Sequence, residues 1–213
     1  MLVAPLVDGI PADALPKESS LQDACDLLWR HTQVRAEAIE LLEVLSTRVD
    51  HLHSDLGNRP ENPLQVHARY TRAEILAAFQ ELQGPRAKEW REGVKWFKEE
   101  SADAFLFTLD KGTGAFSPTT RYRDYALSPE LIHWESQSTT PEDSVTGMRY
   151  RTHVEKNHDI FLFARVSQND RAFWFLGPAT YVEHEGSRPM AIKWRLKHRL
   201  PGDLYASFAA AVA

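Results

Sequence analysis

The side chains best suited to chemistry gather in one stretch, residues 119–140, which Pro118 and Pro141 bracket. The stretch combines three aromatic rings, two arginines and an aspartate with a run of small hydrogen-bonding residues. A buried core segment would be mostly apolar, and a solvated loop would hold few aromatic rings. Aromatic faces beside Asp, Ser, Gln and Thr are the mixture that holds a flat polar ring, such as a nucleobase, by its face and its edge. The composition therefore indicates a binding segment that begins and ends at breaks in regular structure.

The first part of this stretch separates its polar groups if the backbone is extended there, because side chains of a strand alternate between faces. Tyr122 and Asp124 would then share one face, and the other face would carry Arg121, Arg123 and Tyr125. An aspartate carboxylate is a suitable acceptor for the N4 amino group of cytosine. One face therefore suits stacking on a base and reading its edge, and the other suits phosphate groups.

Trp134 would close this candidate pocket from the opposite side, and the polar residues after it would add contacts to the edge of the base. The candidate base pocket comprises Tyr122, Asp124, Tyr125, Trp134, Ser136, Gln137, Ser138 and Thr139. In the alternative interpretation, Tyr122 and Trp134 are core aromatic residues, and Asp124 caps a turn or pairs with an arginine. The residues alone leave both interpretations open.

A second candidate feature is a basic strand near the C-terminus, where Lys193, Arg195, Lys197 and Arg199 alternate with mainly apolar residues. A period of two places all four cations on one face of a sheet. Such a face is suited to a DNA backbone, although the same pattern is typical of the solvated side of an antiparallel sheet.

Two further arginines flank a predicted helix start. Thr71 and Glu74 have the spacing of a capping box, which would place Arg69 and Arg72 near the first turn, either on DNA phosphates or in solvent. The candidate contacts to the DNA backbone are therefore Arg69, Arg72, Lys111, Arg121, Arg123, Lys193, Arg195 and Lys197.

Signals for catalysis are weak. Asp124 and Glu135 loosely resemble the paired carboxylates with which restriction-type nucleases hold a divalent metal, but Gln137 replaces the lysine that such sites need. The histidines lack the spacing of zinc ligands, and Gly112-Thr113-Gly114 lacks the Walker pattern. We therefore expect a binding module without a cofactor. The alternatives are a metal-dependent nuclease and a protein-interaction module that serves a helicase.

The composition, 43% hydrophobic and 26% charged, is typical of a globular protein. Residues 1–60 hold five Lys and Arg against ten Asp and Glu and so carry the whole net charge of -5, whereas residues 61–213 hold twenty of each.

The single cysteine, Cys25, excludes disulfides within the chain. No apolar run approaches the ~18 residues of a membrane span, and the N-terminus lacks the basic region of a signal peptide, so we expect a cytoplasmic protein.

Hydrophobic periodicity predicts an α+β fold in two parts. Residues 1–60 would form a helical leader or coupling element, and residues 61–213 a binding domain whose short strands form a small curved sheet or barrel. The predicted helices span residues 20–30, 33–56, 71–82 and 86–98. The predicted strands span residues 104–109, 147–153, 159–166, 173–176, 180–184 and 190–200.

Several segments resemble the signature of a domain found at the C-terminal end of superfamily 2 helicase proteins. They are Thr120–Tyr125 with His133–Ser138, His67–Ile75, Phe107–Lys111 and Arg188–Leu196. The resemblance covers roughly residues 63–201 in consistent order. In type IV restriction enzymes that join this module to a phospholipase-D-like nuclease and a helicase, the module is similar to SET-and-RING-associated (SRA) domains, which flip 5-methylcytosine out of the duplex.

This resemblance implies an SRA/PUA-like fold and a function without catalysis. The chain would bind duplex DNA containing a modified cytosine of the 5-methylcytosine or 5-hydroxymethylcytosine type, as the recognition module of a modification-dependent restriction system. Its partners would be that DNA and a helicase or nuclease, either fused or separate, and not a membrane.

Overall fold

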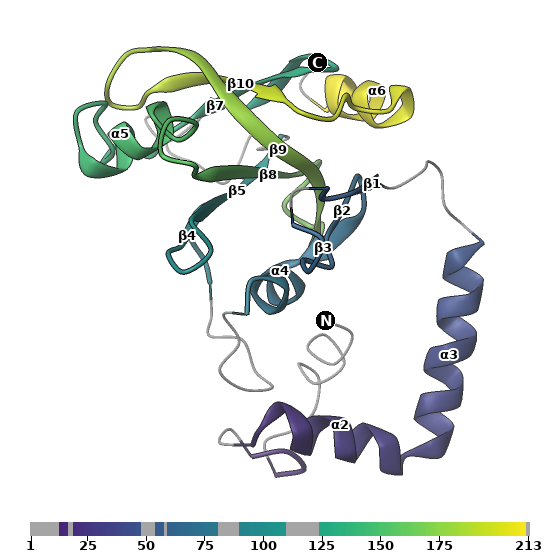
Figure 1. Cartoon of the computed structure of the whole chain (residues 1–213). Coiled ribbons are helices and arrows are strands. Elements are labelled where there is room, and N and C mark those ends of the chain that lie inside the picture. Colours follow the sequence, from purple (N-terminus) through teal and green to yellow (C-terminus); the bar gives the residue numbers. More distant parts are fainter. Residues whose placement is uncertain are drawn as a thin grey trace.

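The computed structural model describes residues 13–16, 19–47, 54–57, 59–80, 90–109 and 124–211. Within these ranges the chain has an α+β fold, with two N-terminal helices followed by a large mixed sheet and three further helices (Figure 1). The fold class predicted from periodicity is therefore confirmed. No helix in the described ranges is long and apolar enough to cross a membrane.

The N-terminal helices are α2 (Leu21–Arg30) and α3 (Thr32–Ser46), and Figure 1 shows them set apart from the sheet. Helix α2 begins where predicted because Ser20 and Asp23 form a capping box, in which each side chain accepts a hydrogen bond from the backbone N–H of the other residue. The predicted extension of the second helix to residue 56 is wrong. A short strand forms near its expected end, and Leu56 is buried in the core of the sheet domain.

Eight strands form one open sheet in the order β4-β5-β8-β9-β10-β7-β6, and β3 pairs with β9 beside that path. The bounds are β3 (Arg69–Thr71), β4 (Val94–Phe97), β5 (Ala102–Thr108), β6 (Tyr125–Ser128), β7 (Leu131–Glu135), β8 (Asp159–Arg165), β9 (Ala172–Glu185) and β10 (Ala191–Leu196). Strands β5 and β8 are parallel, and the other pairs are antiparallel. The sheet follows an open path, so the barrel that was the predicted alternative does not form. A separate small sheet pairs β1 (Ser54–Asp55) with β2 (Gln65–Val66).

The longest strand, β9, holds the sheet together because it pairs with β3, β8 and β10. Two separate strands were predicted here, with a break at Gly177 and Pro178. The structure instead continues through Gly177, which has a φ of +90°. A Cβ at this position would lie 3.1 Å from both methyl groups of Val66, so glycine lets the strand pass closely over β2.

Alternation along the central strands gives the sheet a core on each face. On one face, Phe105 packs with Trp134, Tyr150 and Trp194 beneath α5 (Val145–Arg151) and α6 (Gly202–Ala210). The other face holds a second apolar cluster that packs against α4 (Arg72–Ala78). Its aromatic members are Tyr70, Phe79, Trp90, Phe97, Phe161, Phe163, Phe173 and Phe175.

Two predicted elements have the wrong type. Residues 145–151 form helix α5 instead of a strand, because Ser144 caps its first turn and Gly147 and Tyr150 are buried against the sheet. Residues 94–97 form strand β4 instead of part of a helix. There, pairing with β5 buries Phe97 and leaves Trp96 exposed, which is the alternation of an edge strand.

Candidate functional site

A cavity of about 260 Å³ lies where the first turn of α4, strands β4 and β5, the ends of β7 and β8 and the start of β9 meet. Of the residues predicted for the base pocket or the DNA backbone, Asp124, Trp134, Gln137 and Arg72 border this one space. The full lining is Arg72, Arg91, Gly93, Val94, Leu106, Phe107, Thr108, Asp124, Trp134, Glu135, Gln137, Arg165, Gln168 and Phe173. Residues separated by up to about a hundred positions in the sequence therefore share one wall.

Asp124 and Glu135 are the acidic residues that line this cavity, and the sheet fixes the position of Asp124. It directly precedes β6, and its Oδ1 accepts a hydrogen bond of 3.0 Å from the backbone N–H of Glu135 at the end of β7. Only 6% of the residue is exposed to solvent. This bond orients the carboxylate within the cavity wall.

Trp134 fits both interpretations offered from the sequence. It is buried and stacks on Phe105 with ring centroids 4.4 Å apart and an interplanar angle of 22°. Trp134 also borders the cavity that Asp124 lines. Trp134 is therefore a core aromatic residue that forms part of the cavity wall.

The other candidate pocket residues are divided between this cavity and other surroundings. Gln137 borders the cavity, but Ser136 is fully buried, where its Oγ accepts a hydrogen bond of 2.9 Å from the backbone N–H of Met190. Ser138 and Thr139 are exposed and do not line the cavity in the described structure. Ser136 is therefore a link between β7 and β10 and has no free position toward a ligand.

Tyr125 faces a different part of the sheet. Its ring stacks on His133 with centroids 4.6 Å apart, next to a second cavity of about 270 Å³ that Lys193 also lines. The remaining predicted residues lie outside the described residues: Tyr122, Lys111, Arg121 and Arg123.

The cations of the first cavity were only partly predicted. Arg72 was a candidate for DNA contacts, whereas Arg91 and Arg165 were missed. Both Arg72 and Arg165 lie against Phe173, with guanidinium carbons 5.2 and 4.7 Å from the ring centroid. The sequence did contain a signal for Arg165. It ends the apolar run of β8, and a charged residue next to a buried strand is uncommon unless it has a partner or a function.

The two arginines have mainly neutral partners in the described structure. Arg165 donates from Nε to Thr108 Oγ1 at 2.8 Å and from Nη1 to the carbonyl of Asp170 at 2.6 Å. Arg72 donates from Nη2 to the carbonyl of Glu92 at 3.5 Å. Burial lowers the pKa of both guanidiniums, and the positive charge of Arg165 lowers the pKa of Arg72 further. An arginine nevertheless keeps its charge in proteins, so this wall is cationic.

The predicted backbone contacts on the sheet are not equivalent. Lys193 forms an ion pair of 2.7 Å with Glu183, and Arg69 lies 3.7 Å from Asp170. Arg195 and Lys197 have no ion pair with a carboxylate in the described ranges, and both line a cavity of about 410 Å³. The alternation predicted for the basic strand is confirmed, although β10 ends at Leu196.

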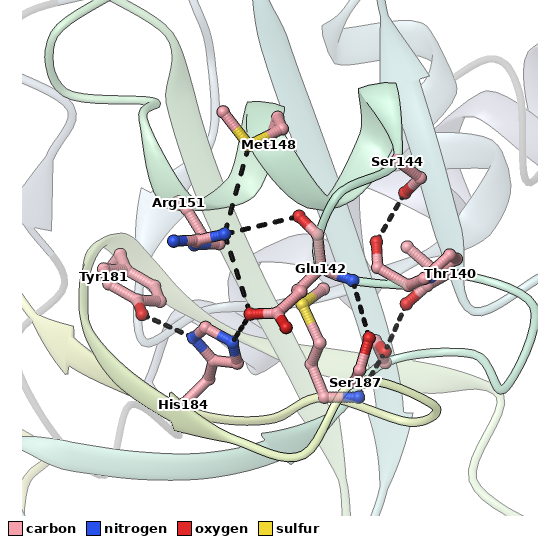
Figure 2. Close-up of polar contacts among 11 residues, drawn as sticks. Thr140, Glu142, Ser144, Met148, Arg151, Tyr181, His184 and Ser187 are labelled. Atoms are coloured by element: carbon pink, nitrogen blue, oxygen red, sulfur yellow. Dashed lines mark hydrogen bonds and ion pairs between the residues drawn. The ribbon is translucent and has the colours of Figure 1, made fainter.

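A polar cluster joins α5 to the β9–β10 hairpin (Figure 2). His184 lies between Tyr181 and Glu142, with Nδ1 2.6 Å from the tyrosine hydroxyl and Nε2 2.9 Å from Glu142 Oε2. Ser187 accepts a hydrogen bond from the backbone N–H of Glu142 through its Oγ, at 3.2 Å. Arg151 adds an ion pair of 3.8 Å to the same carboxylate. These contacts tie three segments together and lie apart from the residues that line the Asp124 cavity.

A second buried polar network lies under α5. Asp103 has no exposed surface, and its two oxygens accept hydrogen bonds of 2.7 and 3.0 Å from Arg149. His158 Nε2 lies 2.8 Å from the same carboxylate. His153 contacts the carbonyl of His158 through Nδ1, and its Nε2 accepts from the backbone N–H of Tyr181. His153 is therefore neutral with its proton on Nδ1, which agrees with a pKa that burial lowers.

Metal binding has limited support in the cavity. Asp124 and Glu135 both line it, as a nuclease site would require. However, the described residues contain no group of three or more His, Cys, Asp and Glu side chains placed to hold a metal ion. The pair could supply two ligands at most, without a third protein ligand from the described part of the chain.

Fold and cavity together define an α+β domain with a small cavity lined by two acidic residues and three arginines. Residues 64–208, more than half of the chain, match the family described as "Domain of unknown function (DUF3427)". The chain belongs to this family. No curated protein matches the chain.

Proposed function

We propose that this chain binds duplex DNA containing a modified cytosine and holds the flipped base in the cavity bordered by Asp124, Trp134 and Gln137. One observation carries the proposal: these three residues and Arg72, selected separately as candidate base or phosphate contacts, line the same space. The cavity volume of about 260 Å³ suits a single small ring. Pockets for drug-sized ligands usually run from ~300 to ~1,000 Å³.

The lining offers the contacts that a flipped cytosine needs. Asp124 is held by the backbone of Glu135 and would accept a hydrogen bond from the N4 amino group. Gln137 offers an amide for a second edge contact, while Trp134 and Phe107 supply apolar surface beside a substituent at C5. Flipping costs a few kcal/mol, and these contacts would have to recover that cost.

The DNA backbone would lie along cations that have no carboxylate partner. Arg195 and Lys197 are exposed and meet this condition in the described structure, whereas Lys193 is occupied by Glu183. Such contacts are blind to sequence and depend strongly on salt. The domain would serve a modification-dependent restriction system in the cytoplasm, as an SRA-like reader linked to a helicase or nuclease. Helices α2 and α3 would form the coupling element.

The direct test is binding to one duplex that carries cytosine, 5-methylcytosine, 5-hydroxymethylcytosine or its glucosylated form at a single position, in EDTA. We expect a modified duplex to bind more tightly than the unmodified one without metal. Asp124→Asn keeps the shape of the side chain and should weaken binding to modified DNA by ~1–3 kcal/mol, the scale of one good base contact. Equal affinity of the parent protein for all four duplexes would overturn the proposal.

A metal-dependent nuclease is the second candidate, because Asp124 and Glu135 line one cavity. In that case the parent protein would cleave a modified duplex only with Mg²⁺ or Mn²⁺. Asp124→Asn would stop cleavage, since the site would lose one of its two carboxylates. Incubation of labelled duplexes with and without Mg²⁺ separates the two functions, and we expect no cleavage in either condition.

A further inference from the structure

The guanidinium of Arg72 has unused hydrogen-bonding capacity inside the cavity wall. It lies against Trp90 and Phe173, with its guanidinium carbon 5.7 and 5.2 Å from their ring centroids. Its Nε is buried and has no hydrogen-bond partner in the described structure. The contact to the carbonyl of Glu92, at 3.5 Å, is long. Burying such a donor without a partner costs free energy, so the arrangement calls for an acceptor.

Arg165 adds a second positive charge to the same wall. Both guanidiniums contact Phe173, and each positive charge raises the cost of burying the other. Neither forms a salt bridge with a carboxylate among the described residues. Two cations are therefore held close together by neutral carbonyls, a hydroxyl and aromatic faces.

Two partly buried arginines elsewhere in the described domain have carboxylate partners within the chain. Arg59 pairs with Glu100 at 3.0 Å and with Asp159 at 2.8 Å, and Arg149 forms a two-pronged contact with Asp103. The chain thus supplies carboxylates to arginines that have structural roles. At the cavity wall the negative charges of Glu92 and Asp170 act on Arg72 and Arg165 from a distance but form no ion pair with them in the described structure, so both guanidiniums can still donate to an oxyanion as a direct partner.

We infer that Arg72 and Arg165 together bind an oxyanion of the DNA ligand. This inference rests on the proposed function, and it adds a second chemical group that the same cavity recognises. The planar fork of a guanidinium matches the paired oxygens of a phosphate or a carboxylate. Asp124 would attract the amino group of the base, and the arginines attract the anionic group. The ligand would therefore enter the cavity in one orientation.

Two sources can supply this oxyanion. One is a phosphate next to the flipped nucleotide, and the other is an acidic substituent at C5, as in 5-carboxylcytosine. A set of otherwise identical duplexes separates them: unmodified cytosine, 5-methylcytosine, 5-methylcytosine flanked by two uncharged methylphosphonates, and 5-carboxylcytosine. Each would be titrated against the parent, Arg72→Gln, Arg165→Gln and the double variant at fixed salt.

A matched control is Arg151→Gln, which removes one positive charge at α5 from a residue that does not line the cavity. Thermal unfolding of each variant checks that it is folded. Arg72→Lys adds a second measurement, since it keeps the charge but loses the fork and should recover only part of the binding.

If a phosphate is the ligand, the parent should bind the 5-methylcytosine duplex about 10- to 100-fold more tightly than its methylphosphonate form, the scale of one or two charge-assisted hydrogen bonds. If the C5 substituent is the ligand, the 5-carboxylcytosine duplex should gain a similar factor over 5-methylcytosine. In either case the double variant should lose this affinity difference between duplexes but still prefer modified to unmodified DNA. The control Arg151→Gln should keep the affinity difference.

Two further results separate failure of this inference from failure of the proposed function. The inference is overturned if the folded double variant discriminates among the four duplexes as the parent does. The proposed function is overturned instead if the parent binds cytosine and 5-methylcytosine duplexes equally. The role of the arginines would then be tested by comparing affinity for the 5-methylcytosine duplex with and without methylphosphonates.

Discussion

Two partly buried arginine environments of the described domain differ in their partners. Under α5, Arg149 faces the fully buried carboxylate of Asp103, which also contacts His158. At the cavity wall, Arg72 and Arg165 share Phe173, and their hydrogen bonds go to neutral oxygens. Arg149 therefore has a direct ion pair within the chain, whereas neither Arg72 nor Arg165 forms an ion pair with a carboxylate in the described structure.

This difference follows from the cost of burying charge. A buried ion is tolerated when paired and hydrogen-bonded, and removal of one partner then leaves an uncompensated charge. A charge that the chain leaves uncompensated is a burden in the free protein, and one that ligand binding can relieve. Functional sites often carry such a cost, which structural sites avoid. This difference favours a structural role for Arg149 and supports the binding role proposed for Arg72 and Arg165.

The largest expected effect is on stability, at the structural site. Arg149→Met should lower the free energy of unfolding by about 3–5 kcal/mol, because it removes the cation that pairs with the buried carboxylate of Asp103 and leaves the hydrogen bond to His158. Urea denaturation, with the midpoint and slope fitted together, measures the change. Modified-DNA binding by the folded fraction should stay near that of the parent. A loss below about 1 kcal/mol would contradict a structural role.

Local features of this fold could be predicted from the sequence. The capping boxes of Ser20 with Asp23 and Thr71 with Glu74 are present, because they depend on residues three positions apart. The apolar run at residues 159–166 corresponds to strand β8, whose middle is fully buried. Signals of this kind need no knowledge of the rest of the chain.

Elements that depend on distant contacts could not be predicted in the same way. Residues 145–151 contain Val, Thr and Tyr, which favour strands, yet they form α5 because Tyr150 packs on Phe105 and Trp134. Tertiary packing outweighs local propensity there.

The candidate site shows the same division. Asp124 and Trp134 were found through the unusual composition of one segment, and both border the cavity. Arg165 was missed because its nearness to Arg72 arises from pairing of β8 with β9 and of β9 with β3, which the sequence does not display. Tyr125 was assigned to the pocket, but it lines another cavity because it lies one position beyond Asp124 on a strand.

The second-largest expected effect concerns cations on the surface, which also differ in whether they have a carboxylate partner. Arg195 and Lys197 have no carboxylate partner in the described structure, whereas Lys193 pairs with Glu183 at 2.7 Å. The double variant Arg195→Ala, Lys197→Ala should reduce the slope of log affinity against log salt by about two units. Between 50 and 200 mM salt, its affinity should therefore fall by a factor roughly tenfold smaller than the factor for the parent. Lys193→Ala, the matched control, should reduce the slope by less than half a unit. Similar slopes for all three proteins would show that these residues do not contact the backbone.

A smaller effect is expected from the histidine beside the structural network. Burial lowers the pKa of His153, so in acid the unfolded chain takes up a proton that the folded chain does not. The free energy of unfolding should therefore fall as the pH drops below about 6.5, by at most about 1.4 kcal/mol per pH unit, and this group should have no effect at higher pH. His198, whose pKa is also lowered, acts in the same direction.

His153→Asn isolates the contribution of His153. The difference in the free energy of unfolding between parent and variant should narrow as the pH falls from 7 to 5.5, because only the parent loses this part of its stability. Denaturation curves at closely spaced pH values measure that difference. A constant difference over the range would mean that His153 titrates in the folded chain as it does in the unfolded chain.

The smallest expected effect is on stability at the cavity wall, and it is the sharpest test of the comparison. Arg72→Met removes a partly buried charge with its buried, unpaired Nε, while the thioether keeps contact with the rings of Trp90 and Phe173. The lost cation–π contacts, about 0.5–1 kcal/mol each when partly exposed, oppose the gain from no longer burying the charge. We therefore expect the free energy of unfolding to change by less than about 1 kcal/mol, against the 3–5 kcal/mol for the same substitution at Arg149. Binding should show the reverse order, with modified DNA bound weakly by Arg72→Met and normally by folded Arg149→Met. Equal losses of stability at the two positions would remove the distinction between them, since both arginines would then be structural.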